Sequence, residues 1–584
     1  MCGIAGIIKL NKTKIDIETI NNMTNIIQHR GPDAEGIWVN SDKTIGFGHR
    51  RLSIIAIGKD GAQPMNYFDN RYTITYNGEI YNYLEIKERL LIKGVIFNTN
   101  SDTEVILASY HIYKEKCLDL FDGMFSFVIY DSLENKVFCA RDRFGEKPFH
   151  YCIYENSFYF GSEIKQFWAA GIPKIIDDTK ITSFIETGFL ESKISKEKTF
   201  YKNILRLDAA HYISLNLDSP KISPVRYWDI DLDKPKYSGN FEDATKVFYS
   251  LLYDSVKLRL RSDVQLGSSL SGGLDSSTIV ALINLISGNT TNQNTFSARF
   301  KDYDKDEGYY IKQILDSCKN LTDYNVWPDS NYFNDILEKV IYFQDEPFGS
   351  SSSVAQYAVM ELAKSKGVKV LLDGQGADEY LAGYPGYYEQ YLNQLFHSSK
   401  QNYYEELKKY NQLHNSNIRH FSETMTLRMK FGLCKRKILN QTIPFNNKLS
   451  EMLHYDTMNN GLQDLLRFAD RNSMAHSVEV RLPFLSHKLV EFVFGLPDNY
   501  KLFEGWSKYI LRNSMKQYLP DTITWRIDKI GYEPPQKSWL SHPLWQQEIS
   551  NSYKYFQVEK EINNQNKGII DKDWRVLISH KYCT

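Results

Sequence analysis

Two stretches of this chain combine residue types at spacings that suit chemistry, and the more distinctive of them spans residues 271–277. It reads Ser-Gly-Gly-Leu-Asp-Ser-Ser and lies between an apolar stretch, residues 264–270, and a densely apolar run, residues 277–286. This pattern predicts a strand, a turn and a buried helix. Such a corner presents backbone amides, hydroxyls and a helix N-terminus to an anion. No lysine follows the glycines, so a phosphate bound here would be held by amides and hydroxyls alone. A tight, Ser-capped turn that binds nothing is the alternative interpretation.

The second stretch begins at Cys2, which directly follows Met1 and has the small neighbours Gly3, Ala5 and Gly6. Small neighbours favour removal of the initiator methionine, and the thiol and a free α-amine would then belong to one residue. The reference pKa values are about 8 for the amine and about 8.5 for the thiol, so the amine can serve as the base for the nucleophile. The alternative is a buried cysteine that begins a strand over residues 2–9.

Further segments of the first hundred residues carry polar groups that could complete such a site. Residues 30–33 (Arg-Gly-Pro-Asp) form a rigid turn, and Arg51 beside an apolar strand could fork onto a carboxylate. After an expected strand over residues 72–76, the amide of Asn77 and the next N–H, that of Gly78, could converge on a developing oxyanion. Asp102 precedes an expected helix, residues 103–113, and could hold an ammonium group. Each segment taken alone is most often a turn or a cap.

In this order behind an N-terminal cysteine, the segments resemble class II (N-terminal nucleophile) glutamine amidotransferases. The resemblance continues through residues 122–127, 141–145 and 162–165 and covers residues 2–205. It implies an α+β fold of stacked antiparallel sheets between helices, and ammonia as a product. It also implies site residues: Cys2 as the nucleophile, Asn77 and Gly78 as the oxyanion hole, Arg51 on the α-carboxylate, Asp102 on the α-ammonium, and Glu79 within the glutamine-binding set.

Composition narrows the class of protein. The chain has 584 residues, of which 42% are hydrophobic and 24% are charged. Its formal net charge is -1, so the overall charge does not favour binding to nucleic acid or to an anionic membrane. No apolar run approaches the ~20 residues of a membrane span, and the N-terminus does not resemble a signal peptide. The seven cysteines form no CxxC pair, which favours reduced thiols over a zinc site. We therefore expect a cytoplasmic protein that acts on small molecules, with a homodimer as a candidate assembly.

The second half of the chain follows a proline-containing join, residues 206–240. Expected strands over residues 264–270, 294–300, 324–327 and 368–372 alternate with expected helices, which predicts a parallel sheet with ligands at the carboxyl ends of its strands. One strand runs into residues 373–379 (Asp-Gly-Gln-Gly-Ala-Asp-Glu), so Asp275 and Asp378 could face each other across bound ATP and share Mg²⁺. A helix N-cap is the alternative for Asp378.

The loop at residues 271–277 resembles the pyrophosphate loop of ATP pyrophosphatases. Residues 470–485 and 506–512 extend the likeness, and the stretch from about 241 to 540 resembles glutamine-hydrolysing asparagine synthetases, with a mainly helical C-terminal part. By this resemblance Lys508 contacts the ATP phosphates and neutralises charge as pyrophosphate leaves; helical spacing places Arg512 on the same face as Lys508. Arg526, Lys529 and Gly531 form a further family-like stretch with open roles. The expected ATP and pyrophosphate set is Leu270, Ser271, Gly272, Gly273, Asp275, Ser276, Ser277, Ala298, Asp373, Gly374 and Lys508.

Together the resemblances imply an amidotransferase domain (2–205), a linker (206–240), a synthetase domain (241–545) and a weakly patterned tail (546–584). Glutamine would be hydrolysed at Cys2, and the ammonia would amidate an adenylated carboxylate, for which aspartate fits best. Gln375 departs from the pattern, because an acid commonly lies between these two glycines and an amide cannot accept a proton near neutral pH. Asp373 or Glu379 could accept it instead, or ammonia could arrive neutral. Two alternatives remain: another acceptor (a sugar, peptide or cell-envelope precursor), or a silent binding or regulatory protein.

Overall fold

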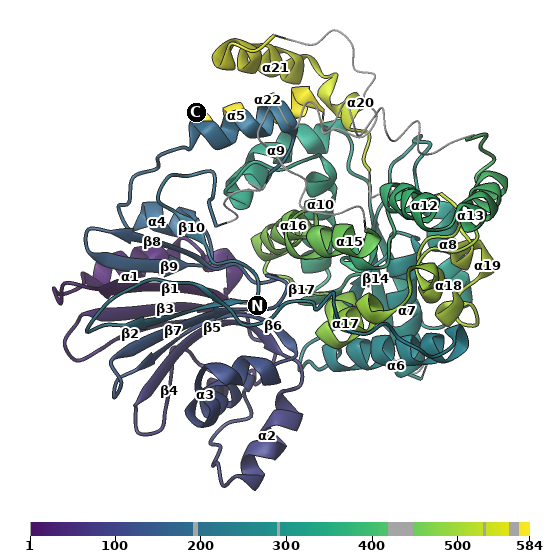
Figure 1. The fold of residues 1–584 in the computed structure, drawn as a ribbon. Coiled ribbons are helices and arrows are strands. Elements are labelled where there is room, and N and C mark those ends of the chain that lie inside the picture. Colours follow the sequence, from purple (N-terminus) through teal and green to yellow (C-terminus); the bar gives the residue numbers. More distant parts are fainter. Residues whose placement is uncertain (1, 191–196, 289–291, 419–447, 529–532, 560–570) are drawn as a thin grey trace.

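The computed structural model describes residues 2–584 except 191–196, 289–291, 419–447, 529–532 and 560–570. Three sheets organise these residues (Figure 1). Two six-stranded antiparallel sheets belong to the first half of the chain, and one five-stranded parallel sheet belongs to the second.

The two antiparallel sheets stack face to face. The first has the order β10-β8-β9-β1-β3-β2 and the second the order β12-β11-β7-β6-β5-β4. Apolar side chains that alternate along the strands fill the space between them, with Ile4 and Phe47 from one sheet against Val128 from the other. The strands are β1 (Gly3–Lys9), β2 (Ala34–Val39), β3 (Ile45–Arg51), β4 (Met65–Tyr67), β5 (Tyr72–Ile80), β6 (Gly123–Asp131), β7 (Lys136–Arg141), β8 (His150–Tyr154), β9 (Ser157–Gly161), β10 (Leu205–Arg206), β11 (His211–Asn216) and β12 (Val225–Arg226).

Helices cover the outer faces of this sandwich. Helix α1 (Ile17–Asn25) packs on the first sheet and buries Ile20 and Met23, while α3 (Asp102–Tyr113) packs on the second sheet and buries Val105 and Ile106. Helix α2 (Tyr83–Ile92) lies beside α3. The expected sandwich of antiparallel sheets between helices is thus confirmed.

The third sheet has the order β15-β14-β13-β16-β17, and every neighbouring pair is parallel. Its strands are β13 (Leu266–Ser269), β14 (Gln293–Ala298), β15 (Leu321–Val326), β16 (Val370–Leu372) and β17 (Glu479–Arg481). Among the helices that pack around it are α6 (Phe241–Arg259), α7 (Leu274–Ile286), α9 (Ser330–Gln344) and α10 (Ser352–Ser365). The predicted parallel-sheet unit is confirmed, and it has a further edge strand, β17, from the part of the chain that was expected to be mainly helical.

The remainder of the second half is mainly helical, as expected. Helix α16 (Leu462–Ala475) packs on α9 and α10, α18 (Tyr509–Met515) packs on α6, and α21 (Pro543–Phe556) packs on α22 (Lys572–Cys583). Although residues beyond about 545 show little pattern in the sequence, Trp574 of α22 is completely buried and its Nε1 donates to the carbonyl of Phe348 at 2.8 Å. The last described residues therefore belong to the core.

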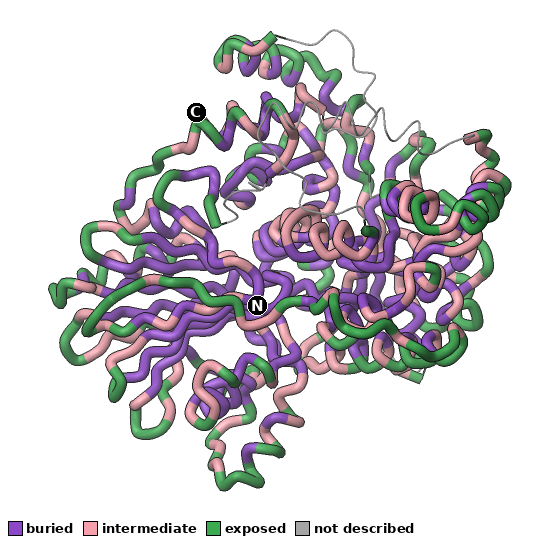
Figure 2. The backbone as a smooth tube through the Cα atoms, viewed as in Figure 1, coloured by how far each residue is buried: buried purple, intermediate pink, exposed green. Residues whose placement is uncertain are grey.

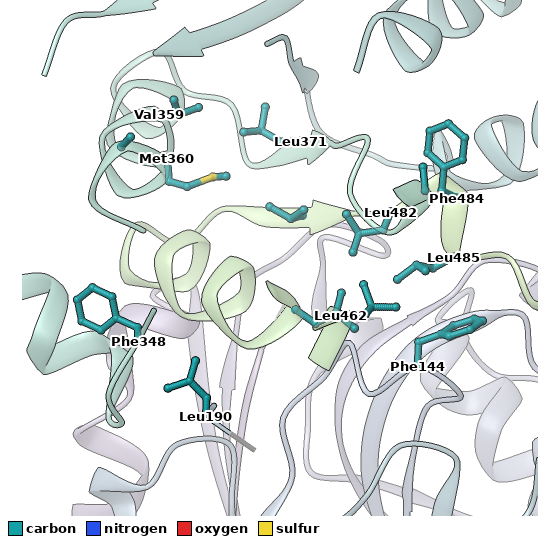
Figure 3. Packing of buried hydrophobic residues seen from close by; sticks show 14 of the residues in the cluster. Phe144, Leu190, Phe348, Val359, Met360, Leu371, Leu462, Leu482, Phe484 and Leu485 are labelled. Atoms are coloured by element: carbon teal, nitrogen blue, oxygen red, sulfur yellow. The ribbon is translucent and has the colours of Figure 1, made fainter. Parts of the chain in front are cut away.

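One apolar cluster joins the two halves. Phe144 and Leu190 of the first half belong to the same buried cluster as Leu462 and Leu485 of the second (Figure 3). Figure 2 shows buried backbone running from the stacked sheets into the helices around the parallel sheet. Among the described residues, no helix is both long enough and apolar enough to cross a membrane.

Candidate active sites

Cys2 lies immediately before β1 and is 8% exposed. Its main-chain nitrogen donates to Oδ1 of Asn77 on β5 at 2.9 Å. Burial raises the pKa of the Cys2 thiol, and the nearby Arg51 guanidinium opposes that shift. A local base is therefore needed to generate the thiolate, which is consistent with the α-amine predicted for that task.

Asn77 is fully buried and keeps one donor unused. While its Oδ1 accepts from Cys2, its Nδ2 has no hydrogen-bond partner among the described residues. An orphaned buried amide usually has a role, because leaving a polar group unpaired costs about 1–3 kcal/mol. An unpaired amide nitrogen on a residue that is hydrogen-bonded to Cys2 is suited to an oxyanion that exists only during a reaction.

The prediction that this strand ends at residue 76 is wrong. Strand β5 continues to Ile80 and pairs residue by residue with β6, including Asn77 with Ser126 and Gly78 with Phe125. Pairing with a neighbouring strand overrides the turn preference of an Asn-Gly sequence. Gly78 has a φ of +155°, and a Cβ there would lie 2.1 Å from the carbonyl oxygen of Met124, so only glycine fits.

Two buried carboxylates belong to this part of the site, one on α3 and one on β5 itself. Asp102 is the first residue of α3, and its Oδ2 accepts from the Tyr76 hydroxyl at 2.8 Å and from the Ile80 amide at 3.0 Å. Glu79 is 5% exposed, and its Oε2 has no partner among the described residues. Burial, and then the neighbouring carboxylates of Glu479 and Asp102, hold the pKa of Glu79 well above its usual range. Such a pair of acids would be stabilised by a cation.

Arg51 occupies the end of β3. Its guanidinium donates to the carbonyls of Gly58 at 2.7 Å and Ala56 at 2.5 Å, which holds the following loop in place. The guanidinium acts electrostatically on Cys2 from this position. The structure thus brings Cys2, Arg51, Asn77, Glu79 and Asp102 into one neighbourhood, and the role of Arg51 toward a carboxylate stays a prediction.

A separate cavity of about 450 Å³ lies at the carboxyl ends of β13 and β16. From the predicted ATP and pyrophosphate set it is lined by Leu270, Ser271, Gly273, Asp275, Ser276, Asp373, Gly374 and Lys508, and Asp378 from the predicted metal pair lines it as well. The other three predicted residues do not line it. Ser277 is buried inside the first turn of α7, Ala298 ends β14, and Gly272 turns its carbonyl to Arg526.

The turn between β13 and α7 is tightly built. The Ser276 hydroxyl receives a hydrogen bond from the Ser271 amide at 3.2 Å and lies 3.0 Å from the Ser271 hydroxyl. Gly272 has a φ of +75°, and a Cβ there would lie 2.7 Å from the Cβ of Tyr310. Helix α7 begins at Leu274, three residues earlier than expected, so the amides of its first turn are next to the cavity. This is the geometry of an anion site at a helix N-terminus.

Lys508 connects the two predicted metal-binding residues. Its Nζ lies 2.5 Å from Asp275 Oδ2 and 2.7 Å from Asp378 Oδ1, and the residue is only 3% exposed. The two carboxylates therefore converge on one positive charge at the edge of the cavity. As predicted, Lys508 and Arg512 lie one turn apart and on the same side, since the Arg512 amide donates to the Lys508 carbonyl at 3.0 Å and both residues line the cavity. Lys508 itself lies just before α18 with a φ of +52°, and the Arg512 guanidinium donates to the Ser507 and Thr524 carbonyls.

Gln375 also lines the cavity. Its backbone N–H donates to Asp373 Oδ1 at 3.0 Å, and its side-chain Oε1 is buried without a partner among the described residues. Burial raises the pKa of Asp373. Glu379 lines the same cavity, where its Oε1 accepts from the Tyr384 hydroxyl at 2.9 Å.

Arg526, whose role the sequence left open, proves to be part of the wall. Its guanidinium donates to the Gly272 carbonyl at 3.1 Å and to Glu307 at 2.8 Å, and stacks over the Tyr310 ring. It therefore holds the turn after β13 from the outside. No spacing signal could have placed it, since it comes from a loop more than two hundred residues later; Lys529 and Gly531 lie outside the described residues.

An N-terminal cysteine site joined to a phosphate-type cavity on a parallel sheet defines the class: an amidotransferase unit fused to a second enzyme unit. Residues 1–228 match the family model described as a glutamine amidotransferase domain, and residues 248–571 match the one described as asparagine synthase. The chain belongs to the asparagine synthase family.

Three relatives illustrate the similarity. A putative glutamine-hydrolysing asparagine synthetase 2 of Methanocaldococcus jannaschii is 38% identical over 405 residues, 66% of this chain and 76% of the relative. Two glutamine-hydrolysing asparagine synthetases of Bacillus subtilis follow. Synthetase 1 is 29% identical to this chain, and the match spans 100% of this chain and 93% of the relative. Synthetase 3 is 30% identical, and the match spans 96% of this chain and 91% of the relative.

Proposed function

We propose that this chain hydrolyses glutamine at Cys2 and uses the ammonia to amidate aspartate at the cavity of the second half, with ATP cleaved to AMP and pyrophosphate. The family is one in which ATP use and small-molecule substrates are expected. The observation that carries the proposal is the orphaned Asn77 amide beside Cys2, in a chain that also holds a phosphate-type cavity.

At the first site, the Cys2 sulfur bonds to the side-chain amide carbon of glutamine. The α-amine, once Met1 is removed, takes the thiol proton and passes it to the leaving nitrogen. Asn77 Nδ2 and the Gly78 amide stabilise the oxyanion, the C–N bond breaks, and ammonia leaves. Water then cleaves the thioester to release glutamate. Asp102 and Glu79 hold the substrate ammonium, and Arg51 holds its carboxylate.

At the second site, a carboxylate oxygen of the acceptor bonds to the α-phosphorus of ATP and pyrophosphate departs. The first-turn amides of α7 and the hydroxyls of Ser271 and Ser276 bind the leaving phosphates. Lys508 moves from its two carboxylates toward the phosphates and neutralises the charge that develops on them. Ammonia then attacks the acyl-adenylate, and the products are an amide and AMP.

Asp275 and Asp378 fit a role in holding Mg²⁺ with the nucleotide. Their oxygens already converge on a cation, the Lys508 ammonium, and Mg²⁺ in nucleotide sites commonly takes one or two carboxylates with the phosphates supplying further ligands. Among the described residues there is no group of three or more His, Cys, Asp or Glu side chains that could bind a metal by itself. When bound with the nucleotide, the ion would offset phosphate charge.

Aspartate is the acceptor that the named relatives favour. The uncharged Gln375 keeps a second acceptor, such as a sugar, peptide or cell-envelope carboxylate, as the alternative, because its orphaned amide Oε1 can accept a hydrogen bond but no proton near neutral pH. Pyrophosphate release with glutamine and ATP, measured across a panel of carboxylates, decides between them. If millimolar aspartate supports no release while another carboxylate does, the aspartate assignment is wrong and the amidotransferase chemistry stands.

A further inference from the structure

Strand β17 belongs to the parallel sheet, yet its side chains reach the glutamine site of the first half. It is the edge strand of that sheet, next to β16, and Leu482, which follows it, belongs to the same buried apolar cluster as Leu371 (Figure 3). The Arg481 guanidinium lies with its Nη2 3.7 Å from Oε1 of Glu79 on β5. A residue of the second half therefore faces a carboxylate that the proposed function assigns to glutamine.

The Arg481 guanidinium is fully buried and firmly placed. Its Nε donates to Glu479 Oε1 at 2.6 Å, and its Nη1 donates to the carbonyls of Arg259 at 2.7 Å and Arg261 at 2.6 Å. Its Nη2 has no hydrogen-bond partner among the described residues, and neither does Oε2 of Glu79. The two oppositely charged groups that approach each other across the boundary between the halves thus each keep one polar atom unpaired among the described residues.

The charges at this boundary do not balance. Glu79, Asp102 and Glu479 are all buried and act on one another electrostatically, and two cations, Arg481 and the N-terminal amine, act on both Glu79 and Glu479. When all three acids are ionised, the cluster carries surplus negative charge. A bound ammonium group would offset that surplus and satisfy the orphaned Glu79 oxygen.

We propose that Glu479 and Arg481 are positioning residues of the glutamine site: Arg481 keeps Glu79 charged and directed toward the substrate ammonium, and Glu479 limits how tightly Arg481 pairs with Glu79. The proposal rests on the proposed function, since it needs glutamine at this site. It adds two residues from the synthetase half to a site that sequence patterns placed wholly in the first half.

The pH dependence of glutamine use reports on this arrangement. The charged and titratable groups that act on Glu79 are Asp102, Glu479, Arg481, Tyr76, Tyr83, Cys2 and the N-terminal amine. Glu79 must be ionised to hold an ammonium, so kcat/KM for glutamine falls as pH drops through the pKa of Glu79. Removing the positive charge of Arg481 raises that pKa and moves the acid limb to higher pH. Removing the negative charge of Glu479 lowers that pKa and moves the limb to lower pH.

The experiment measures glutaminase kcat/KM against pH in the full chain, with Glu479→Gln and Arg481→Met compared with wild type. We expect the acid limb to move down by about one pH unit in Glu479→Gln and up by about one in Arg481→Met. Arg481→Met should also raise KM for glutamine by about tenfold at neutral pH, with a smaller change in kcat, and Arg481→Lys should recover most of that loss.

Glu346→Gln is the matched control, because Glu346 is equally buried and paired with Arg206 and Arg467, away from Glu79. The acid limb of the glutaminase pH profile should be unchanged in this variant.

Ammonia-dependent pyrophosphate release is the internal standard. The backbone carbonyl of Arg481 accepts from the Asp373 amide at 3.0 Å, so a general collapse of β17 would disturb the ATP cavity and lower this activity too. The proposal is supported if the acid limbs of the two variants move in opposite directions while both variants retain ammonia-dependent pyrophosphate release. Shifts in the same direction, or unchanged limbs and KM, overturn it. If Arg481→Met does not fold, the direction of the Glu479→Gln shift decides alone. A wild-type protein without glutaminase activity would refute the proposed function instead.

Discussion

Replacing Asn77 tests the glutamine site most directly, because one side chain there carries two separable hydrogen bonds. Its Oδ1 accepts from the Cys2 nitrogen at 2.9 Å, and its Nδ2 is the orphaned donor. Asn77→Ala removes both groups, whereas Asn77→Asp keeps an acceptor for Cys2 and removes the amide donor. If Nδ2 stabilises the oxyanion, the two variants should share one defect.

The magnitude follows from what each group does. Loss of one preorganised oxyanion donor lowers kcat by about 10²–10³, or about 2.7–4 kcal/mol of transition-state stabilisation. The hydrogen bond to Cys2 contributes about 1 kcal/mol to stability and acts on the ground state. We therefore expect both variants to lose glutaminase kcat by at least a hundredfold while KM changes by a few-fold, and Asn77→Ala to be slightly less stable than Asn77→Asp.

Glutamate release measures the first activity, and ammonia-dependent pyrophosphate release measures the second. The second should be nearly unchanged in both variants, because Asn77 does not line the ATP cavity. A kcat within tenfold of wild type in Asn77→Ala, or a defect confined to KM, would show that Nδ2 is not the oxyanion donor. Recovery of full kcat in Asn77→Asp would assign the effect to the Cys2 hydrogen bond instead.

Four further changes probe the remaining parts. Cys2→Ala should abolish glutamine-dependent synthesis and leave synthesis from ammonium salts largely intact; retained glutaminase activity would refute the nucleophile. Asp378→Asn should spare glutaminase activity and stop pyrophosphate release, because it removes one of two carboxylates that converge on the cavity; near-normal AMP formation would exclude a metal-binding role. Gln375→Glu should retain activity but make amidation rise with pH through a new carboxyl pKa, and an unchanged profile would exclude position 375 from proton transfer. Trp574→Ala should destabilise the protein by about 3–5 kcal/mol in thermal or denaturant unfolding, since it empties a fully buried site; a loss below about 1 kcal/mol would contradict the packing seen for α22.

Local pattern was sufficient to predict the elements that carry the two sites. The strands expected over residues 2–9 and 72–76 correspond to β1 and the first part of β5, and the small-residue turn after β13 predicted the strand–turn–helix corner with nearly its observed bounds. These predictions succeeded because the signal lies within a few neighbouring residues. Where the sequence failed, the deciding interaction came from a distant part of the chain.

Three cases show this. Asn77 and Gly78 read as a turn, but pairing with β6 keeps them in the strand. Lys508 reads as helical, but its ion pairs with Asp275 and Asp378 accompany a left-handed backbone just before α18. No neighbouring residue could have indicated that Glu479 and Arg481 form a strand, because a three-residue strand has no period of its own and exists through its pairing with β16.

That pairing also sets the order in which the molecule can be completed. The four strands β13 to β16 leave the ribosome long before β17, and until β17 arrives the edge of β16 and the amide of Asp373 have no partner. The stacked antiparallel sheets need no strand from the later part of the chain, because all of their strands are synthesised earlier. Contacts between residues so far apart in sequence form slowly, because a long loop must close first. A nascent chain would thus carry completed antiparallel sheets together with a parallel sheet that still lacks β17. The exposed edge of β16 is where we expect a chaperone, or a second unfolded copy, to bind first.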